Sequence, residues 1–307
     1  LSLPEITSVT RLDIGTNVIF FSDENTGCEY EIQRQDESGN WSTIGKTADH
    51  IYYDIAAPEN GSYNYKVLAL GTDGEMAESE IAAENTNPKT VFGVPVLMYH
   101  CISDEITGDG VLYVSPENME AQLKYLTENG YTTMFLHELA DADQYEKPVI
   151  LTVDDGYLDN YTELFPLLKK YSCKATIFVV TDLVDKASHK MTSQQLRELA
   201  SSGLVSIQSH TASHPHLKRL SREKQQEELL RSRLAVARFT GRVPYALCYP
   251  YGEYNRDTLK LVQEYYGLGL QIGNADFLTG TDRRTISRWY VKRATTMEEF
   301  IEMVTVQ

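Results

Sequence analysis

The sequence predicts an α/β protein in which a small all-β sandwich, residues 1–88, precedes a closed parallel (β/α) barrel, residues 89–307. In the first part, short alternating segments occur with no helical period. In the second part, strand and helix patterns alternate in seven or eight units. The charge is also divided: residues 1–88 hold 4 Lys and Arg against 16 Asp and Glu, whereas the remainder holds 24 against 28. This asymmetry indicates two domains with separate roles.

The overall composition excludes several classes of protein. The chain has 307 residues, of which 42% are hydrophobic and 23% charged, as in an ordinary globular protein. No apolar run approaches the roughly 18 residues that a transmembrane helix needs. The net charge of −16 argues against nucleic acid as a partner, because the phosphate backbone would be repelled. The chain starts at Leu1 with no visible signal peptide, so we interpret it as a processed or trimmed piece.

The cysteines do not form a recognisable framework. All four lie far apart and no C-x-x-C pair occurs, which argues against a zinc ribbon or a dithiol redox site. We expect them to be free thiols, with one disulfide among the last three as the alternative. They are Cys28, Cys101, Cys173 and Cys248.

The first 88 residues contain alternating segments separated by turns rich in Asp, Gly and Asn. Examples are residues 18–21, 30–34 and 63–69. Short strands at this spacing predict a β-sandwich. The position of Trp41 and the strand pattern of residues 63–69 resemble a fibronectin type III domain. Residues 85–89, Asn-Thr-Asn-Pro-Lys, predict a linker.

From residue 94 onward, apolar strands alternate with helices that carry recognisable caps. Ser115 followed by Pro116 predicts one helix start, and the capping box Thr192-x-x-Gln195 predicts another. Further helices are expected over residues 159–171 and about 221–240. The expected strands are residues 95–100, 148–154, 174–180, 205–210, 246–250, 268–273 and 286–292. This many units favours a closed barrel, with a doubly wound sheet as the structural alternative.

Polar side chains follow four of these strands directly. They are Asp154 and Asp155, His210 and His214, His100, and Tyr251. Because the carboxyl ends of barrel strands meet at one face, we expect these residues to converge there. Two imidazoles and a carboxylate suit Zn²⁺ or a similar divalent ion and leave room for a bound water. A second carboxylate, free of the metal, can take a proton from that water.

Each of these elements also has a purely structural interpretation. Adjacent carboxylates often form a solvated turn, a His-x-x-x-His pair is often a surface pair, and a histidine that ends a strand is often buried and hydrogen-bonded to a carbonyl. We expect His216 to belong to this non-functional class. The functional interpretation is favoured because carboxylates and imidazoles end separate strands on one face. This constellation is typical of metal-assisted hydrolysis.

Three segments carry a family resemblance. Residues 152–157 (TVDDGY), 209–215 (SHTASHP) and 249–255 (YPYGEYN) resemble the first three motifs of the polysaccharide deacetylase family, carbohydrate esterase family four. The resemblance runs from about residue 94 to the C-terminus. It implies a distorted (β/α)₇ barrel that removes acetyl groups from polysaccharides.

The resemblance also implies roles for individual residues. Asp154 matches the catalytic base, and the backbone N–H of Tyr251 matches the donor to the oxyanion. Asp155, His210 and His214 match the three ligands of a divalent metal, for which we expect Zn²⁺.

Two departures from the family pattern bear on these roles. Where many members have an arginine that holds the catalytic aspartate, this chain has Cys248, and we expect Arg288 to replace that arginine. No histidine follows His216, although many members supply the acid from a C-terminal Leu-x-His motif. Residues 95–100 (PVLMYH) resemble the circularly permuted subgroup that deacetylates poly-β-1,6-N-acetylglucosamine, in which His100 would be the acid.

The function expected from the sequence is therefore metal-dependent hydrolysis of N-acetyl groups on a polysaccharide built from N-acetylglucosamine. One alternative is an O-acetyl esterase on another glycan such as xylan. Another is a glycan-binding surface protein with a decayed barrel. We expect a secreted bacterial protein that works extracellularly or at the cell surface, with the sandwich domain docking the enzyme at the surface or cell wall.

Overall fold

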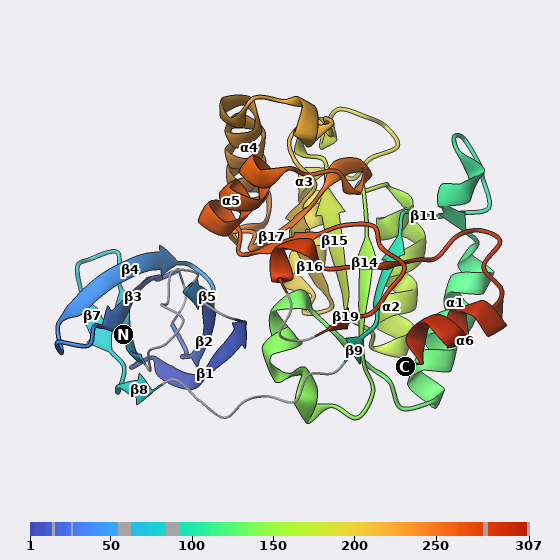
Figure 1. The fold of residues 1–307 in the computed structure, drawn as a ribbon. Coiled ribbons are helices and arrows are strands. Elements are labelled where there is room, and N and C mark those ends of the chain that lie inside the picture. Colours follow the sequence, from blue (N-terminus) through green and yellow to red (C-terminus); the bar gives the residue numbers. More distant parts are fainter. Residues whose placement is uncertain (14–15, 26, 55–62, 84–92, 279–281, 306–307) are drawn as a thin grey trace. The chain divides into compact units, whose positions relative to one another are not determined.

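The computed structural model describes residues 1–13, 16–25, 27–54, 63–83, 93–278 and 282–305. The chain forms two compact units, Leu1–Thr90 and Val91–Gln307, and each is described here by itself (Figure 1). The expected boundary between residues 88 and 89 and the expected linker, residues 85–89, lie outside the described residues. All four cysteines are free thiols.

The first unit is all-β and its sheets are antiparallel, as the sequence predicts. One sheet has the strand order β1-β2-β5 and the other β4-β3-β6-β7, with β8 also paired to β6. The strands are β1 (Glu5–Asp13), β2 (Thr16–Ser22), β3 (Glu29–Gln35), β4 (Trp41–Thr47), β5 (Ile51–Asp54), β6 (Asn64–Leu70), β7 (Met76–Glu78) and β8 (Ala82–Ala83). The likeness to a fibronectin type III domain stays a prediction.

The core of the first unit follows from the alternation in its strands. Every second residue of β6 is buried, as the period of two in a strand requires: Tyr65, Val67 and Ala69 are fully buried. They pack with residues of the other strands, which include Ile19, Phe21, Tyr30 and Ile32. This apolar cluster is the hydrophobic core that stabilises the unit.

The second unit is built on one curled parallel sheet, with the order β18-β17-β16-β15-β14-β10-β20 and β13 paired to β14. The segment that leads into β20 bridges to β18, at the other end of this order: Ile286 N–H donates to Gly269 O at 2.8 Å, and Gln271 N–H donates to Ile286 O at 2.9 Å. The α/β barrel prediction is thus confirmed, and the doubly wound alternative is wrong. The strands are β10 (Val96–Tyr99), β13 (Thr132–Met134), β14 (Pro148–Val153), β15 (Ala175–Val179), β16 (Val205–Ser209), β17 (Ala246–Cys248), β18 (Leu268–Leu270) and β20 (Trp289–Tyr290).

Two short strand pairs lie outside this sheet. β9 (Gly93–Val94) pairs with β19 (Phe277–Leu278), and β11 (Cys101–Ile102) pairs with β12 (Tyr113–Val114). The strand expected over residues 286–292 is shorter than predicted, because only Trp289–Tyr290 pairs with β10 in the sheet while Ile286 bridges to Leu270. Residues 286–290 thus pair first with β18 and then with β10, so each of the two paired stretches is short.

The helices begin where the sequence places their caps. The Ser115 hydroxyl caps α1 (Pro116–Glu128), and Thr192 and Gln195 form the capping box of α3 (Ser193–Ser201). Gly241, with a φ of 77°, ends α4 (Arg222–Thr240) in the left-handed conformation that glycine adopts easily. The other helices are α2 (Phe165–Tyr171), α5 (Arg256–Tyr265) and α6 (Met297–Val304). Short 3₁₀ turns are η1 (Gly110–Leu112), η2 (Leu136–Gln144), η4 (Thr181–Leu183), η5 (Leu217–Arg219), η6 (Pro250–Gly252) and η7 (Arg283–Thr285).

The helix expected over residues 159–171 differs from the prediction. Its first turn, η3 (Asn160–Leu164), is a π-helix, and α2 starts only at Phe165. Pro166 follows directly, and a proline has no N–H to donate to the preceding turn. The Phe165 N–H instead donates to Asn160 O, which gives the wider π spacing.

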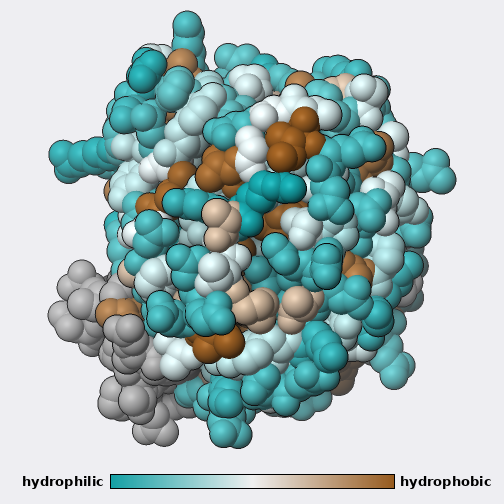
Figure 2. All heavy atoms as spheres, turned by 90° about the vertical axis from the view of Figure 1, so that its right-hand side faces the viewer, coloured by the Kyte–Doolittle hydropathy of each residue, from teal (hydrophilic) through white to brown (hydrophobic). Residues whose placement is uncertain are grey.

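Helices pack against the outer face of the curled sheet, and the space between holds the main core of the unit (Figure 1). The side that lies to the right in Figure 1 is mainly hydrophilic, with hydrophobic residues in small groups (Figure 2). Among the described residues, no helix combines the length and apolar character that crossing a membrane requires. The strands thus form a rigid, buried scaffold whose carboxyl ends carry the polar residues discussed next.

Candidate active site

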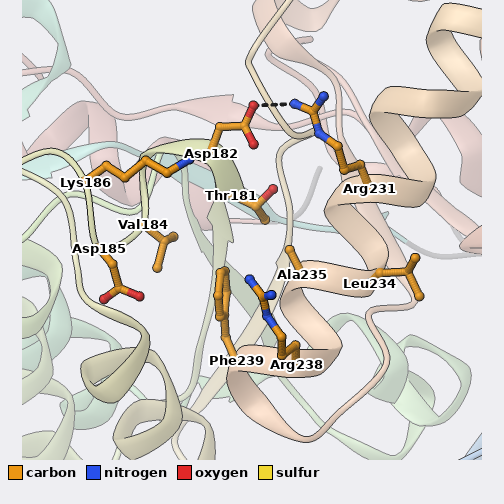
Figure 3. Close-up of a pocket in the computed structure, with 10 residues that line it drawn as sticks. All are labelled: Thr181, Asp182, Val184, Asp185, Lys186, Arg231, Leu234, Ala235, Arg238 and Phe239. Atoms are coloured by element: carbon orange, nitrogen blue, oxygen red, sulfur yellow. Dashed lines mark hydrogen bonds and ion pairs between the residues drawn. The ribbon is translucent and has the colours of Figure 1, made fainter.

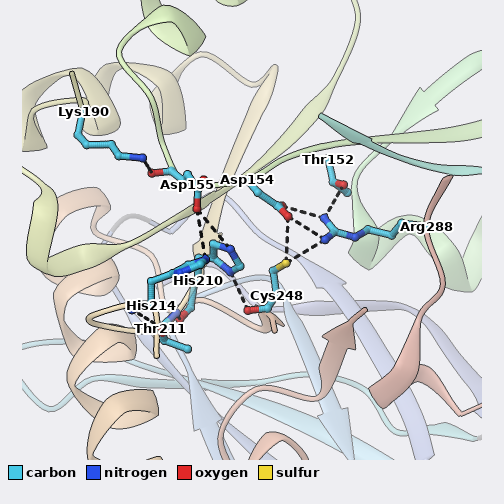
Figure 4. Close-up of polar contacts among 10 residues, drawn as sticks. Thr152, Asp154, Asp155, Lys190, His210, Thr211, His214, Cys248 and Arg288 are labelled. Atoms are coloured by element: carbon cyan, nitrogen blue, oxygen red, sulfur yellow. Dashed lines mark hydrogen bonds and ion pairs between the residues drawn. The ribbon is translucent and has the colours of Figure 1, made fainter. Parts of the chain in front are cut away.

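The polar residues that follow separate strands converge at the carboxyl end of the sheet (Figure 4). Asp155 follows β14, while His210 and His214 lie in the loop after β16. Their ligand atoms all lie within 4.8 Å of one another. Since residues that are 55 and 59 positions apart in sequence meet here, the parallel register of β14, β15 and β16 creates the group.

The spacing within this group suits a tetrahedral metal ion. Asp155 Oδ1 lies 3.5 Å from His210 Nε2 and 3.6 Å from His214 Nε2. Two ligand atoms bound to one tetrahedral Zn²⁺, each at about 2.0–2.2 Å, lie about 3.4 Å apart. The three side chains therefore fit an ion of this size, and three protein ligands leave one coordination position for water or substrate.

The protonation states of the two histidines also suit metal binding. His210 Nδ1 lies 2.8 Å from the carbonyl oxygen of Cys248. Because a carbonyl can only accept a hydrogen bond, Nδ1 carries a proton, and Nε2 is the ring nitrogen that faces Asp155. Burial and the neighbouring His210 lower the pKa of His214 to about 4, so its ring is neutral near pH 7. Metal ligation requires this neutral form.

Asp154 lies beside the group but is held by a different partner. Arg288 donates from both terminal nitrogens to the two carboxylate oxygens of Asp154, at 2.8 Å each. Both side chains are almost completely buried. Burial alone would raise the pKa of Asp154, but the Arg288 charge outweighs it and holds that pKa well below its usual range. Asp154 is consequently a carboxylate at neutral pH, and Oδ1, which accepts one described hydrogen bond, has a further lone pair that can accept a proton.

Arg288 is itself fixed on every side. It donates to Thr152 Oγ1 at 3.0 Å and, through Nε, to Gln271 O at 3.1 Å. The residue is fully buried, so it cannot reorient without leaving unpaired donors. The structure thus places Arg288 where the sequence analysis expects an arginine to hold Asp154.

Cys248 completes the group around Asp154. Its thiol donates to Asp154 Oδ2 at 3.3 Å and accepts from Arg288 at 3.1 Å. Asp154, His210 and Cys248 form a second set of possible metal ligands. Burial raises the pKa of the Cys248 thiol well above its usual value, which disfavours the thiolate that binds metals. The adjacent Arg288 cation also disfavours a metal ion, and the set with Asp155 is the better candidate.

Backbone strain concentrates in the same loops. Among the described residues, seven residues other than glycine have a positive φ, and four of them lie here: Asp155, Thr211, His214 and Tyr251. Such conformations cost about 1–3 kcal/mol each and cluster at functional sites. Next to Asp155, Gly156 has a φ of +65°, and a Cβ there would lie 2.9 Å from Val179 Cγ1. Glycine is therefore required at position 156 by both conformation and space.

Tyr251 lies at the edge of the metal group. Its φ of 60° interrupts the short turn η6, and its side chain is 52% exposed. The ring contacts His214 edge-on, with centroids 4.7 Å apart, and stacks on His216 at 4.0 Å. His216 Nδ1 in turn lies 2.9 Å from Glu253 Oε2. His216, expected to have no part in function, thus lies against a proposed site residue, although nothing in the local sequence pattern distinguishes it.

His100, at the end of β10, lies near the same group. Its ring is 5.5 Å from that of Tyr290, and its buried Nδ1 has no hydrogen-bond partner within the described part of the chain. Burial lowers the pKa of His100, while the charges of Asp154 and Asp155 act on it in the opposite direction. A structural histidine bonded through Nδ1 to a nearby carbonyl does not fit this arrangement. A buried polar atom without a partner is uncommon and is consistent with a site that binds something.

Lys190 is a site residue that sequence reasoning missed. Its ammonium donates to the backbone oxygen of Asp155 at 3.1 Å and lies 3.2 Å from the ring centroid of Tyr157. Only 7% of the residue is exposed. Lys190 thereby holds the strained turn at Asp155 in place (Figure 4). No sequence signal identifies it, because Lys190 lies 35 positions from Asp155 in a region without a motif.

Comparison with known proteins agrees with this geometry. Residues 141–269 match the family model described as polysaccharide deacetylase. YxkH of Bacillus subtilis (strain 168), provisionally assigned as a polysaccharide deacetylase, is 38% identical over 185 residues, 59% of this chain and 63% of YxkH. The poly-beta-1,6-N-acetyl-D-glucosamine N-deacetylase of Escherichia coli (strain K12) is 31% identical over 138 residues, 39% of this chain and 20% of that protein. The matched region thus spans less than two thirds of either relative.

A solved structure extends the similarity to both units. BA0330 of Bacillus anthracis, also provisionally assigned as a polysaccharide deacetylase, is 25% identical with a TM-score of 0.67. The match covers 99% of this chain and all of that one. The family match spans β14 to β18 and contains the Asp154–Asp155 and His210–His214 motifs. These comparisons show that residues 141–269 of the second unit are similar to the polysaccharide deacetylase family, and the curled sheet and the converging motifs agree with that similarity.

Proposed function

We propose that the second unit is a metal-dependent N-deacetylase that hydrolyses acetamide groups on a polymer of N-acetylglucosamine. The observation that carries the proposal is the pairing of two neighbouring carboxylates with different partners. Asp155 faces two imidazoles at distances that suit a metal ion, whereas Asp154 is bound by Arg288. A metal-binding carboxylate beside a free basic one is what hydrolysis by an activated water requires.

Asp155, His210 and His214 would hold the divalent ion. When bound, such an ion polarises a carbonyl and makes a coordinated water more acidic. Asp154 then accepts the proton of the attacking water, because Arg288 keeps the carboxylate ionised and oriented. Arg288 thus acts through Asp154 and is a positioning residue.

Two further residues complete the proposed mechanism. The backbone N–H of Tyr251 donates to the oxyanion of the tetrahedral intermediate, a contact whose loss typically costs about 2.7–4 kcal/mol of transition-state stabilisation. His100 delivers a proton to the departing amine, which is a poor leaving group when unprotonated. Because burial lowers the pKa of His100, its ring is neutral at rest and must gain this proton during turnover.

The substrate class rests on two supports. One relative is named a poly-beta-1,6-N-acetyl-D-glucosamine N-deacetylase. The second is that His100 lies at the start of the barrel, as in the subgroup that the sequence resembles, and its Nδ1 has no partner among the described residues. An O-acetyl esterase acting on a glycan such as xylan would not need this acid, because an alkoxide leaves more readily than an amine anion. A decayed barrel that only binds glycans would be expected to lack a ligand or the base, and all are present.

We propose further that the ion is Zn²⁺ and that the protein works outside the cell or at its surface. Two imidazoles and one carboxylate at tetrahedral spacing support the choice of Zn²⁺. A polysaccharide substrate of this class supports the location. The sandwich unit would then attach the enzyme near its polymer.

The decisive experiment measures acetate release by the full chain from a panel of acetylated glycans. The panel contains β-1,6-linked and β-1,4-linked N-acetylglucosamine oligomers and acetylated xylan. We expect release from an N-acetylglucosamine oligomer, loss of activity after chelation, and recovery on adding Zn²⁺. Release that chelation leaves unchanged would contradict the metal-dependent mechanism. Release from acetylated xylan alone would favour the esterase, and binding without release would favour the glycan-binding protein.

A further inference from the structure

The loop between the two proposed histidine ligands is strained. It runs from Thr211 to Ser213, and both Thr211 and His214 have a positive φ, of 66° and 61°. Neither residue is glycine, so this conformation does not persist by its own preference. Contacts with the surroundings must therefore hold the loop in the shape that directs His210 and His214 at one point.

One side chain supplies three of these contacts. Glu228 lies on α4, and its side chain is 13% exposed. Its Oε2 accepts hydrogen bonds from the backbone N–H groups of Ala212, at 3.1 Å, and Ser213, at 2.9 Å. Its Oε1 accepts from the Ser213 hydroxyl at 2.8 Å. A single carboxylate thus binds three donors of the loop, and bonds to an ionised acceptor are the strong ones.

The same carboxylate is linked to the loop after β15. Arg231 lies 3.8 Å from Glu228 and forms an ion pair with Asp182 (Figure 3). The backbone N–H of Asp182 donates to Ala212 O at 2.9 Å. Arg231 and Asp182 also line a surface pocket of about 450 Å³ beside α4. Ala212 is therefore bonded through its N–H to α4 and through its carbonyl to the loop after β15.

We propose that Glu228 is a positioning residue that sets the metal affinity of the site by holding the loop between His210 and His214. Glu228 does not contact His210 or His214 through any described hydrogen bond and acts only through the loop backbone. Replacing outer partners of metal ligands typically weakens metal binding 10–100-fold. This inference depends on one part of the proposed function, namely that His210 and His214 bind a metal ion.

The test compares variants of the full chain in binding of Zn²⁺ alone, measured by competition with a chelating dye. E228A removes all three contacts and should weaken binding 10–100-fold. E228Q should stay within about threefold of wild type, because an amide oxygen can accept from both backbone N–H groups and its NH₂ can donate to the Ser213 hydroxyl. The matched control is E227A, since Glu227 lies next in sequence and approaches Arg231 at 3.7 Å but makes no described hydrogen bond to the loop.

Further measurements separate positioning from general destabilisation. Thermal unfolding of the metal-free proteins should give similar midpoints for E228A and E227A, while hydrogen exchange at Ala212 and Ser213 should accelerate in E228A only. Zn²⁺ affinity in E228A equal to that of wild type would overturn the inference. So would an equal loss of affinity in E227A. If wild type itself binds no Zn²⁺, the proposed metal function fails instead.

Discussion

Both units of the molecule bury an aspartate against an arginine, yet the surroundings of the two pairs differ. In the sandwich, Arg34 contacts Asp54 at 2.7 Å, and the Tyr65 hydroxyl donates to the same carboxylate oxygen at 2.8 Å. In the barrel, Arg288 donates hydrogen bonds from both terminal nitrogens to Asp154. This pair lies beside the three proposed metal ligands. The seven residues other than glycine with positive φ among those described all lie in the second unit.

This difference teaches that a buried ion pair is not by itself evidence of a site. The Asp54 pair joins β3, β5 and β6, and an unfolded or misregistered sandwich would leave it unpaired. The Asp154 pair instead adjoins strained loops, two metal-suited imidazoles and a buried nitrogen without a described partner. Strained backbone and neighbouring imidazoles at metal-binding distances are what distinguish the Asp154 pair from the Asp54 pair.

The largest expected effect separates the two aspartates. D154N should keep bound metal but lose nearly all turnover, since Asn cannot accept the proton of the attacking water. D54N should leave turnover unchanged but lower the free energy of unfolding of the sandwich by about 3 kcal/mol, because it breaks a buried pair. Acetate release, metal content and chemical denaturation measure the three quantities. Activity near wild type in D154N would require another base.

The next prediction concerns the metal group. H210A should lose stoichiometric metal and remain folded, because one of three ligands is removed from a pre-formed scaffold. Its counterpart in the sandwich is H50A, since His50 also contacts an aspartate, Asp23, at 3.1 Å. H50A should leave the metal content unchanged. Full metal occupancy in H210A, measured by elemental analysis, would contradict the assignment of the ligands.

Replacing His100 is expected to reduce turnover less than replacing Asp154 does. H100A should reduce turnover about 10²–10⁴-fold, the usual contribution of an acid, with metal content unchanged. The control is H137A, because His137 is a partly buried histidine of the same unit whose Nδ1 lies 3.0 Å from the Tyr245 hydroxyl. H137A should lower stability and leave turnover intact. Equal activity in H100A and wild type would refute the role as acid.

The smallest effect concerns the pH dependence of the sandwich. Burial opposes ionisation of Asp23, but hydrogen bonds from Asn25, Tyr30 and His50 outweigh it and lower its pKa. A lowered pKa in the folded state means stability that is present above the ordinary value of 3.8 and lost as the pH falls through the lowered value. D23N should therefore reduce the loss of sandwich stability between pH 4 and pH 2, measured by denaturation at each pH. An unchanged pH dependence would exclude this contribution.

Local sequence predicted much of the fold because the features concerned act over a few residues. The caps at Ser115, Thr192 and Gly241 each involve neighbours within about four positions, and the helices begin or end there. The motif residues could be found for a related reason: polar side chains directly after apolar strands must lie at the ends of those strands. Once a barrel topology is assumed, the strand ends that carry Asp155, His210 and His214 are expected to lie together, as they do.

The sequence by itself determined which residues form strands and helices, where the main helices are capped, and which side chains lie at the catalytic face. Tertiary structure decided partners that the sequence did not indicate: Lys190 reaches Asp155 across 35 positions, and Glu228 reaches the histidine loop from α4. The contact of Arg288 with Asp154, across 134 positions, was expected only from the family resemblance. The physical reason is that local propensity depends on a residue and its near neighbours. A contact between distant segments depends instead on the register of every strand between them, and no single stretch of sequence contains that information.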